Sequence, residues 1–216
     1  DAPPGRVTAI ARIDGGRVRA VRFRNVPSFV LALDETVDVP GYGRVRYDLA
    51  FGGAFYAYVD ASDVGLRGLP EEEGALIAAG RTIKRAVSAA RTIPHPLDAD
   101  LGFLYGVIFI APPLGEGADS RNVCVFADGE IDRSPTGTGV SARMALHYAR
   151  GEVSLGQPLV IESILGTRFT GWAVEEVPCG PYSAVVPEVE GSAHMTGRHQ
   201  FVVDPDDPLQ GGFLLR

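Results

Sequence analysis

Residues 123–151, VCVFADGEIDRSPTGTGVSARMALHYARG, predict a strand, a turn, a polar loop and then a helix. The loop at 132–139 carries an acid, an arginine, three hydroxyls and two glycines. The helix expected over 140–150 is apolar on most faces, with Ser141, Arg143 and His147 as its polar interruptions. Such a helix is typical of a buried position. The N-terminus of a buried helix is therefore expected to open onto the densest set of polar groups in the chain.

The rest of the chain is rich in strand patterns joined by short turns. Alternating apolar residues on both sides of 14–16 (Asp-Gly-Gly) predict a half-exposed antiparallel hairpin. An amphipathic helix is expected over 70–91, with acids at its start and arginines towards its end. Further strands are expected at 29–33, 35–39, 44–60, 103–110, 122–127, 159–165, 169–177, 185–189 and 200–204. Because most strand connections are short, the predicted fold class is α+β: a mainly antiparallel, curved, barrel-like sheet around the buried helix.

A Gly52-Gly53 pair interrupts the strand pattern of 44–60. Glycines inside a strand mark a bulge or a close approach of another group to the backbone. Two interpretations stay open, a kink in the strand and a backbone surface that faces a ligand.

Composition argues against several classes of partner. The net charge is −7 and the basic residues form no cluster, so we expect no nucleic-acid partner and no anionic membrane surface. No apolar run reaches transmembrane length, and no signal peptide is visible. Cys124 and Cys179 lack the spacing of a zinc site, which predicts two buried free thiols and a cytoplasmic protein. The chain begins abruptly at DAPPG, and we expect further sequence upstream.

The end of the polar loop suits an anion. Gly137, Thr138 and Gly139 fall at the first turn of the helix, where the N–H groups lack intrahelical partners and the dipole is positive. The glycines leave these groups uncovered, and the hydroxyls of Thr136 and Thr138 add donors. A carboxylate or a phosphate would fit there.

Asp132 lies a few residues before this anion site. Its carboxylate could pair with a substrate ammonium, and the two features together would suit an α-amino acid zwitterion. The alternative is that Arg133 simply neutralises Asp132.

A competing motif is the dinucleotide fingerprint, matched by Gly137-x-Gly139-x-x-Ala142 with Glu162 further on. The fingerprint requires its glycines directly after the first strand, whereas DGEIDRSPT intervenes here within an antiparallel pattern. None of the four histidines has a metal-like neighbour. We therefore expect neither a cofactor nor a metal.

The stretch DRSPTGTGVSARMALHYARGE closely resembles the second active-site motif of the proline racemase family. That family includes hydroxyproline epimerases and trans-3-hydroxy-L-proline dehydratases. The resemblance extends to 25–29 (NVPSF), 48–60 (DLAFGGAFYAYVD), 161–171 (IESILGTRFTG) and the tail at 186–213, and so covers essentially the whole chain.

The resemblance implies a two-lobed, diaminopimelate epimerase-like enzyme, in which each lobe is a sheet around a central helix and the substrate lies between the lobes. The family's first lobe carries a cysteine in a CGHG-type motif, which this sequence lacks. Residues 1–196 are therefore expected to be the second lobe, and 197–216 a closing tail that returns to the missing first lobe. The full-length protein is expected to be a homodimer, and this chain alone to be inactive.

The family has a second catalytic cysteine at the position of Thr136. Racemases and epimerases need a base on each face of Cα, and a threonine hydroxyl is too weakly acidic for that role. The resemblance therefore favours the dehydratase branch, in which the first-lobe cysteine removes the Cα proton, the 3-hydroxyl leaves and Δ1-pyrroline-2-carboxylate forms. The alternatives are a cofactor-independent 4-hydroxyproline epimerase or proline racemase, and a catalytically inactive binding lobe.

The resemblance also assigns roles to single residues. Asp132 would hold the substrate ring nitrogen, and the 137–139 segment would seat the carboxylate. Phe126 would line the ring pocket. Thr136 would face Cα or the 3-hydroxyl as a hydrogen-bonding group.

Overall fold

The computed structural model describes residues 2–213. This part of the chain forms eleven strands, two α-helices and three short 3-10 helices. In chain order the strands and α-helices are β1 (Thr8–Asp14), β2 (Arg17–Arg24), β3 (Ser28–Val39), β4 (Gly43–Phe51), β5 (Phe55–Asp60), α1 (Glu73–Ala90), β6 (Leu104–Ala111), β7 (Ser120–Phe126), β8 (Glu130–Ile131), α2 (Gly137–Ala149), β9 (Leu159–Glu162), β10 (Arg168–Cys179) and β11 (Tyr182–Gly191).

Eight of the strands close into a barrel. Hydrogen-bonded neighbours follow the order β11-β10-β9-β7-β6-β5-β4-β3, and β3 pairs back onto β11 to complete the ring. All of these pairs are antiparallel except β5–β6 and β7–β9. A parallel pair needs a long crossover, and the two crossovers contain α1 and α2. The sheet is therefore mainly antiparallel, as the short connections predicted.

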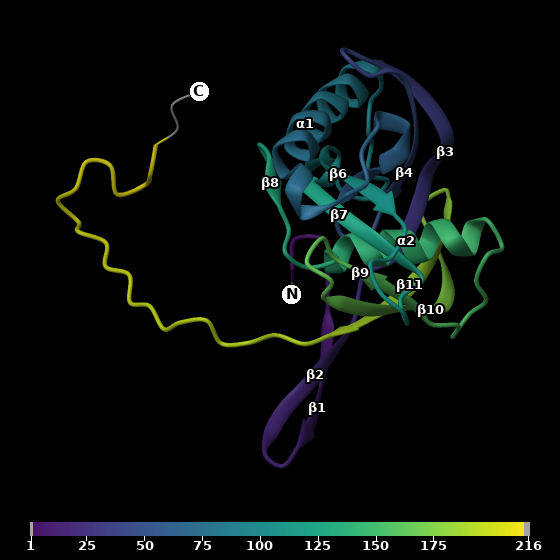
Figure 1. The fold of residues 1–216 in the computed structure, drawn as a ribbon. Helices are drawn as coiled ribbons and strands as arrows, with labels where there is room; N and C mark the ends of the chain where they lie inside the picture. The colour runs from purple at the N-terminus through teal and green to yellow at the C-terminus, as the bar shows by residue number, and fades with distance from the viewer. Residues whose placement is uncertain (1, 214–216) are drawn as a thin grey trace.

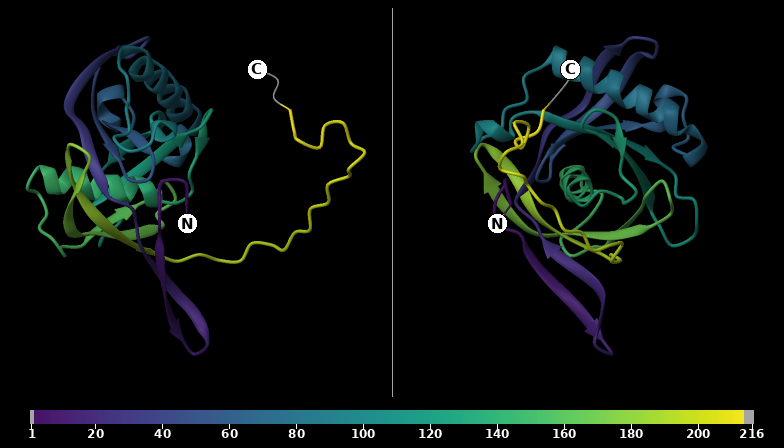
Figure 2. Two further views of the ribbon diagram at one scale, coloured as in Figure 1. Left: turned by 180° about the vertical axis from the view of Figure 1, so that it is seen from behind. Right: turned by 90° about the vertical axis from the view of Figure 1, so that its left-hand side faces the viewer.

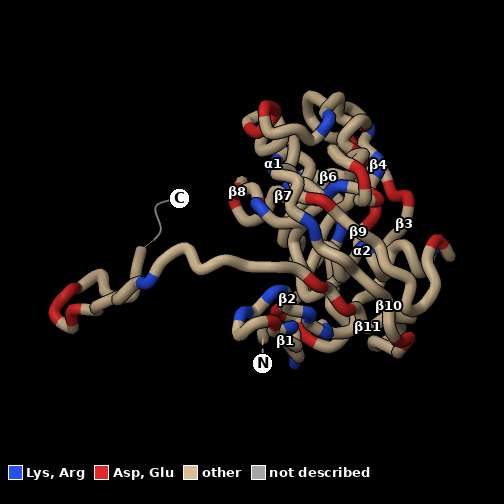
Figure 3. The backbone as a smooth tube through the Cα atoms, turned by 60° about the horizontal axis from the view of Figure 1, so that its bottom comes forward, with Lys and Arg blue, Asp and Glu red and all other residues tan. Residues whose placement is uncertain are grey.

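The β1–β2 hairpin lies outside this ring. β2 pairs with the last residues of β11, and the hairpin projects from the body of the molecule (Figure 1). Blue segments mark its arginines in Figure 3. Three of them form ion pairs: Arg19 with Asp14 within the hairpin, Arg22 with Glu188 and Glu190 at 3.4 Å, and Arg24 with Glu175.

Helix α2 is surrounded by strands. It contacts β3, β4, β5, β10 and β11, and every residue from Gly139 to Leu146 is buried. The right-hand view of Figure 2 shows it end-on within the ring. Eight-stranded barrels usually have room only for side chains, so small residues must line this contact. A Cβ added at Gly52 would lie 2.2 Å from the Thr138 carbonyl oxygen, and one at Gly171 would lie 2.9 Å from Met144 Sδ.

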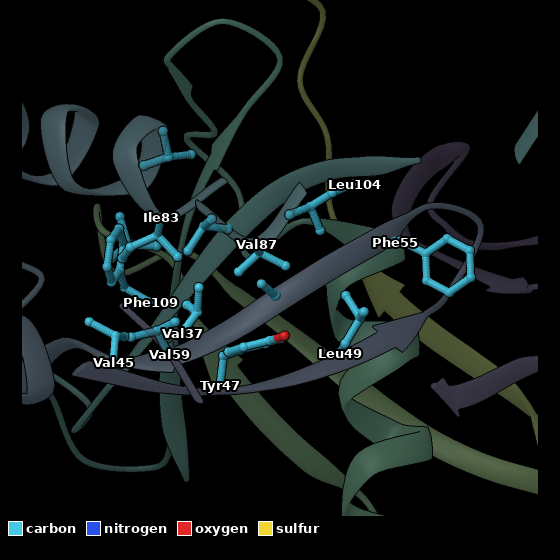
Figure 4. Close-up of a cluster of buried hydrophobic side chains, with 14 of the residues drawn as sticks. Val37, Val45, Tyr47, Leu49, Phe55, Val59, Ile83, Val87, Leu104 and Phe109 are labelled. Carbon is cyan, nitrogen blue, oxygen red and sulfur yellow. The ribbon is translucent and has the colours of Figure 1, made fainter. Parts of the chain in front are cut away.

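Helix α1 packs on the outer side of the sheet. Its buried residues Leu76, Ile83 and Val87 recur on one face and join the largest apolar cluster, which fills the space above β3 to β6 (Figure 4). Removal of this apolar face from water is the main force that holds α1 in place. The predicted helix at 70–91 is confirmed, with a 3-10 turn at Pro70–Glu72 before α1.

Three boundary predictions were wrong. The strands expected at 29–33 and 35–39 are one strand, β3, whose pairing is irregular near Asp34, a residue with φ 55. The strand expected at 44–60 is two strands, because Gly52-Gly53 forms the turn that pairs Phe51 with Phe55. Helix α2 begins at Gly137, so the boundary at residue 140 was wrong, whereas the placement of Gly137, Thr138 and Gly139 in its first turn is confirmed.

The glycine pair itself has two different neighbours. Gly52 faces the α2 backbone, so the close approach there is to a helix and not to a ligand. Gly53 has φ 106 and lines an open cavity, described below.

The tail after β11 is extended. Residues 192–213 contain neither helix nor strand and run away from the body in Figure 1, so the strand expected at 200–204 was wrong. Exposed apolar side chains in this segment are Met195, Phe201, Val202, Val203, Leu209 and Phe213. The division at residue 197 stays a prediction. Within 2–213, no helix combines the length and apolar character required to span a membrane.

Candidate active site

The loop between β8 and α2 folds around Asp132. Its Oδ1 accepts the Ser134 N–H at 2.8 Å, and its Oδ2 accepts the Thr136 hydroxyl at 2.9 Å. The Ser134 hydroxyl oxygen in turn accepts the Thr136 N–H at 3.0 Å. Such short side-chain bonds compete with regular secondary structure and define the loop. Among the described residues, Arg133 forms no ion pair with Asp132. Instead it lines a separate cavity with Pro70 and Glu73. The alternative that Arg133 neutralises Asp132 was therefore wrong.

Thr136 has an unusual backbone. It is the N-cap of α2, with φ 68 and ψ 103. Positive φ is rare for a β-branched residue, and a conformation of this kind costs about 1–3 kcal/mol unless the surroundings impose it. The Thr136 carbonyl accepts the Val140 N–H at 2.7 Å, and the preceding Pro135 carbonyl accepts from Asn122 Nδ2 at 3.0 Å.

The N-terminus of α2 opens onto a cavity. The first hydrogen bond of the helix uses the Val140 N–H, which leaves those of residues 137–139 without an intrahelical partner. The cavity has a volume of about 360 Å³ and is lined by Phe23, Tyr56, Tyr105, Phe126, Asp132, Thr136, Gly137 and Thr138. A positive helix terminus and a carboxylate thus face one small aromatic space.

Five of the six residues singled out from the sequence line this cavity: Phe126, Asp132, Thr136, Gly137 and Thr138. Gly139 lies behind them. A Cβ there would approach Ile108 Cδ1 to 2.4 Å, and its carbonyl accepts the Tyr58 hydroxyl at 2.7 Å. Gly139 therefore makes room for the Ile108 side chain of β6.

Gly137 is also constrained by packing, because an added Cβ would lie 2.9 Å from Phe23 Cζ. The sequence suggested only that the two glycines uncover N–H groups. The structure adds that each one makes room for a side chain from a distant strand.

Three aromatic walls were missed by sequence reasoning: Phe23 on β2, Tyr56 on β5 and Tyr105 on β6. The Tyr105 ring stacks on Phe126 at 5.7 Å between centroids, and Tyr56 meets Tyr105 edge-on at 5.9 Å. Tyr56 lies in the 48–60 segment that carries the family resemblance, which is the one signal that pointed to it. A second cavity of about 700 Å³ shares these three residues and Thr138, and extends past Gly53 to Asp98 and Asp100.

Burial keeps the polar groups around the helix terminus protonated. It raises the pKa of Tyr56 well above its ordinary value, so the phenol stays a donor; its oxygen lies 2.8 Å from Thr138 Oγ1. Burial also raises the pKa of Cys124 to about 12, although a hydrogen bond with Thr136 acts in the opposite direction. Cys124 and Cys179 are both free and buried, as predicted. In the part of the chain that is described, no group of His, Cys, Asp and Glu could hold a metal.

A cavity with an uncovered helix N-terminus, a carboxylate that bears no ion pair with any described residue and aromatic walls has the layout of a site for a small zwitterion. The chain belongs to the proline racemase family: the family model described as "Proline racemase" matches residues 1–214. It is 50% identical to a trans-3-hydroxy-L-proline dehydratase of Colwellia psychrerythraea over 216 residues, and 47% identical to that of Homo sapiens over 222 residues. These alignments cover 100% and 99% of this chain and 61% of each relative, so the chain spans about three fifths of their length.

Two solved structures share the fold. One is a hydroxyproline epimerase from Agrobacterium vitis with bound trans-4-hydroxy-L-proline, with a TM-score of 0.89 and 36% identity over 98% of this chain and 60% of the other. The second is a probable proline racemase from Agrobacterium radiobacter with bound carbonate, with a TM-score of 0.90 and 34% identity over 98% of this chain and 62% of the other.

Proposed function

We propose that the full-length protein dehydrates trans-3-hydroxy-L-proline to Δ1-pyrroline-2-carboxylate, and that this chain supplies the half of the site that binds the carboxylate and the amine. The observation that carries the proposal is Thr136, which occupies the N-cap of α2 on the cavity wall and donates its hydroxyl to Asp132. Identity to the dehydratases, at 47–50%, exceeds that to the epimerase structure, at 36%, and supports the same branch.

In this proposal the substrate carboxylate binds the free N–H groups of 137–139 and the Thr138 hydroxyl. The ring ammonium donates to Asp132. A carboxylate has about four lone-pair sites, and Asp132 uses one on each oxygen within the loop, so acceptor capacity remains. The pyrrolidine ring then lies against Phe126, Tyr105 and Tyr56, which line the same space.

The chemistry starts with removal of the Cα proton by the cysteine of a first lobe. Negative charge that develops on the carboxylate is stabilised by the N-terminus of α2. The C3–O bond breaks, the hydroxyl leaves with a proton as water, and the resulting enamine tautomerises to the cyclic imine. The Thr136 side chain cannot return a proton to the opposite face of Cα near neutral pH, which favours elimination over epimerisation.

The architecture that we propose is the two-lobed, diaminopimelate epimerase-like one. Residues 1–196, with α2 as the central helix, form the second lobe, and 197–216 close onto the first. The exposed apolar side chains of the tail support this role, because they have no partner surface within the described chain. The full-length enzyme would be a cytoplasmic, cofactor-independent homodimer, and the 216-residue chain alone would be inactive.

A second candidate is a cofactor-independent hydroxyproline epimerase or proline racemase. The observation in its favour is that both structural neighbours carry such names at TM-scores of 0.89 and 0.90. A third candidate, a binding lobe without catalysis, would show ligand affinity but no turnover.

The test uses the full-length gene product. Incubation with trans-3-hydroxy-L-proline should yield a pyrroline detectable by its imine chemistry, and incubation with trans-4-hydroxy-L-proline in D2O should leave Cα unlabelled. Formation of a D-configured product would support the epimerase instead. Turnover by the 216-residue chain alone would contradict the half-site assignment.

A further inference from the structure

Arg143 is a buried cation without an acidic partner. It lies in α2 with 3% of its surface exposed, and within residues 2–213 no carboxylate oxygen comes within ion-pair distance. Burial lowers the pKa of its guanidinium to about 10, so it stays charged at neutral pH. Buried charges are costly and are retained only where hydrogen bonds compensate them. Its neighbours should therefore show what the charge is used for.

The two terminal nitrogens of the guanidinium bond to neutral groups, whereas Nε is buried without a hydrogen-bond partner among the described residues. Nη1 donates to Ser120 Oγ at 2.8 Å and to Asn122 Oδ1 at 3.0 Å, and Nη2 lies 3.0 Å from His147 Nε2. Arginine has only donors. The oxygen of the Asn122 amide must therefore face Arg143, and its NH2 group must face the opposite way.

That NH2 group holds the active-site loop. Asn122 Nδ2 donates to the Pro135 carbonyl at 3.0 Å. Because the peptide bond is planar, anchoring this carbonyl also orients the peptide that leads into Thr136 and its φ of 68. The first half of the loop is held by two other hydrogen bonds. The Asp132 N–H donates to the Cys124 carbonyl, and the Thr167 hydroxyl donates to the Arg133 carbonyl. Asn122 is thus the anchor of the second half.

His147 completes the chain of bonds. Its Nδ1 lies 2.5 Å from Glu152 Oε2, and a carboxylate only accepts. Nδ1 therefore carries the proton, and Nε2 offers its lone pair to Arg143. The connected series runs from Glu152 on the surface through His147, Arg143 and Asn122 to Pro135.

We propose that Arg143 is a positioning residue: by orienting the Asn122 amide, it holds the Pro135–Thr136 peptide and so shapes the N-terminal site of α2. The effect on turnover rests on the proposed function. The effect on loop geometry does not, and it is measured separately.

The test compares three variants in the 216-residue chain. R143M removes the donors, so the Asn122 amide is free to rotate. N122A removes the anchor. N122D keeps an acceptor, and gains an ion pair, for Arg143 but cannot donate to the Pro135 carbonyl.

The readout is amide hydrogen exchange of Ser134, Thr136 and Val140, normalised to exchange in α1 so that local opening is separated from global unfolding. All three variants should exchange about tenfold faster at these amides, as expected for loss of a hydrogen bond to the loop. If the loop amides of N122D exchange at the wild-type rate, the proposal is overturned. Asn122 would then serve only as an acceptor for the buried Arg143 charge, and its bond to the Pro135 carbonyl would not hold the loop.

Arg121 is the matched control. Like Arg143, it is 3% exposed. It directly precedes Asn122 on β7, so its side chain points to the other face of the strand. There it donates to the Arg67 carbonyl at 2.9 Å. R121M should lower the melting temperature without changing the normalised loop exchange. If R121M accelerates loop exchange as much as R143M does, the effect is general loss of a buried arginine and the proposal fails.

In the full-length protein, R143M and N122D should lower kcat more than they raise KM, and R143K should restore part of kcat. Absence of turnover in the wild type would contradict the proposed function and leave the exchange result as the measure of positioning. Fast loop exchange with unchanged kcat would contradict the positioning of a catalytic loop by Arg143.

Discussion

Helices α1 and α2 both connect parallel strand pairs, yet they are built for opposite places. Helix α1 buries one face and exposes the other, whereas α2 has an unbroken run of buried residues, 139–146. Their N-termini differ in the same way. At α1, a 3-10 turn at Pro70–Glu72 leads into the helix, the Glu73 N–H donates to the Pro70 carbonyl, and the first turn carries the acid Glu73. At α2 the first turn has no acid, and its free N–H groups face the cavity.

The difference shows where a fold leaves a site available. A helix terminus that is extended by a 3-10 turn and carries its own acid is poorly suited to an anion, whereas a terminus with no acid and with free N–H groups on a cavity can bind one. The glycines follow the buried and exposed faces: an added Cβ at Gly52 or Gly171 would lie within 3 Å of α2, and one at Gly80 on the buried face of α1 would lie 2.7 Å from Val125. On the exposed face of α1, Gly74 has nothing within 4 Å.

The largest effect is expected for Gly52→Ala. The new methyl group would meet the Thr138 carbonyl oxygen at 2.2 Å and the Ala142 nitrogen at 2.4 Å, both backbone atoms that cannot swing aside. Overpacking of this kind costs about 3 kcal/mol or more. Urea unfolding should show the loss, and a wild-type midpoint would contradict the close fit of α2 in the barrel.

Changes at Thr136 should alter activity more than stability. Thr136→Val in the full-length protein keeps the side-chain shape but removes the hydroxyl that donates a hydrogen bond to Asp132. This change should lower kcat/KM for trans-3-hydroxy-L-proline about tenfold or more. Thr136→Ser, which keeps the hydroxyl, is the control. Thr136→Cys should add Cα epimerisation, detected by chiral chromatography, and an unchanged product profile would count against the second-base argument.

The two helices should also respond to acid at different pH. Burial, together with Arg143, lowers the pKa of His147 below its ordinary value of 6.5, despite the opposing effect of Glu152. The folded state then binds fewer protons than the unfolded state, so its stability falls as pH drops below about 6.5. His147→Gln should flatten this part of a melting-temperature profile.

At α1 the loss of stability in acid should begin at lower pH than at α2. Desolvation alone would raise the pKa of Glu72, but the amides of Arg67 and Leu69 and the Arg67 guanidinium lower it to about 2. Its contribution is complete above 4.5 and is lost as pH falls towards 2. Glu72→Gln should change the profile only in that lower window, and an effect at pH 6 would contradict the assignment.

The smallest effect is expected for Gly74→Ala near the start of α1. The added methyl group meets no atom within 4 Å, and alanine loses less backbone entropy than glycine in a helix. A gain of about 0.5 kcal/mol is expected. A loss of stability in urea unfolding would show that α1 is less exposed there than the structure indicates.

Local pattern was sufficient for some elements and insufficient for others. The amphipathic period of 70–91 predicted α1, and alternation around 14–16 predicted the β1–β2 hairpin. A short strand was also expected at 200–204, and the structure lacks it, because a strand needs a partner edge as well as a suitable sequence. Gly52-Gly53 looked like an interruption of one strand and proved to be a turn between two.

By itself, the sequence determined the polar part of the candidate site. Asp132, Thr136, Gly137 and Thr138 lie so close along the chain that their meeting at one helix terminus requires only local hydrogen bonds. Tertiary structure alone decided the rest. Phe23 lies on β2, outside the ring, and Tyr56 and Tyr105 lie on β5 and β6, which pair only through the long α1 crossover. The bond from Asn122 to Pro135 depends on the placement of α2 within the barrel. Contacts of that kind are set by sheet topology and by the space left inside the ring, which no short stretch of sequence encodes.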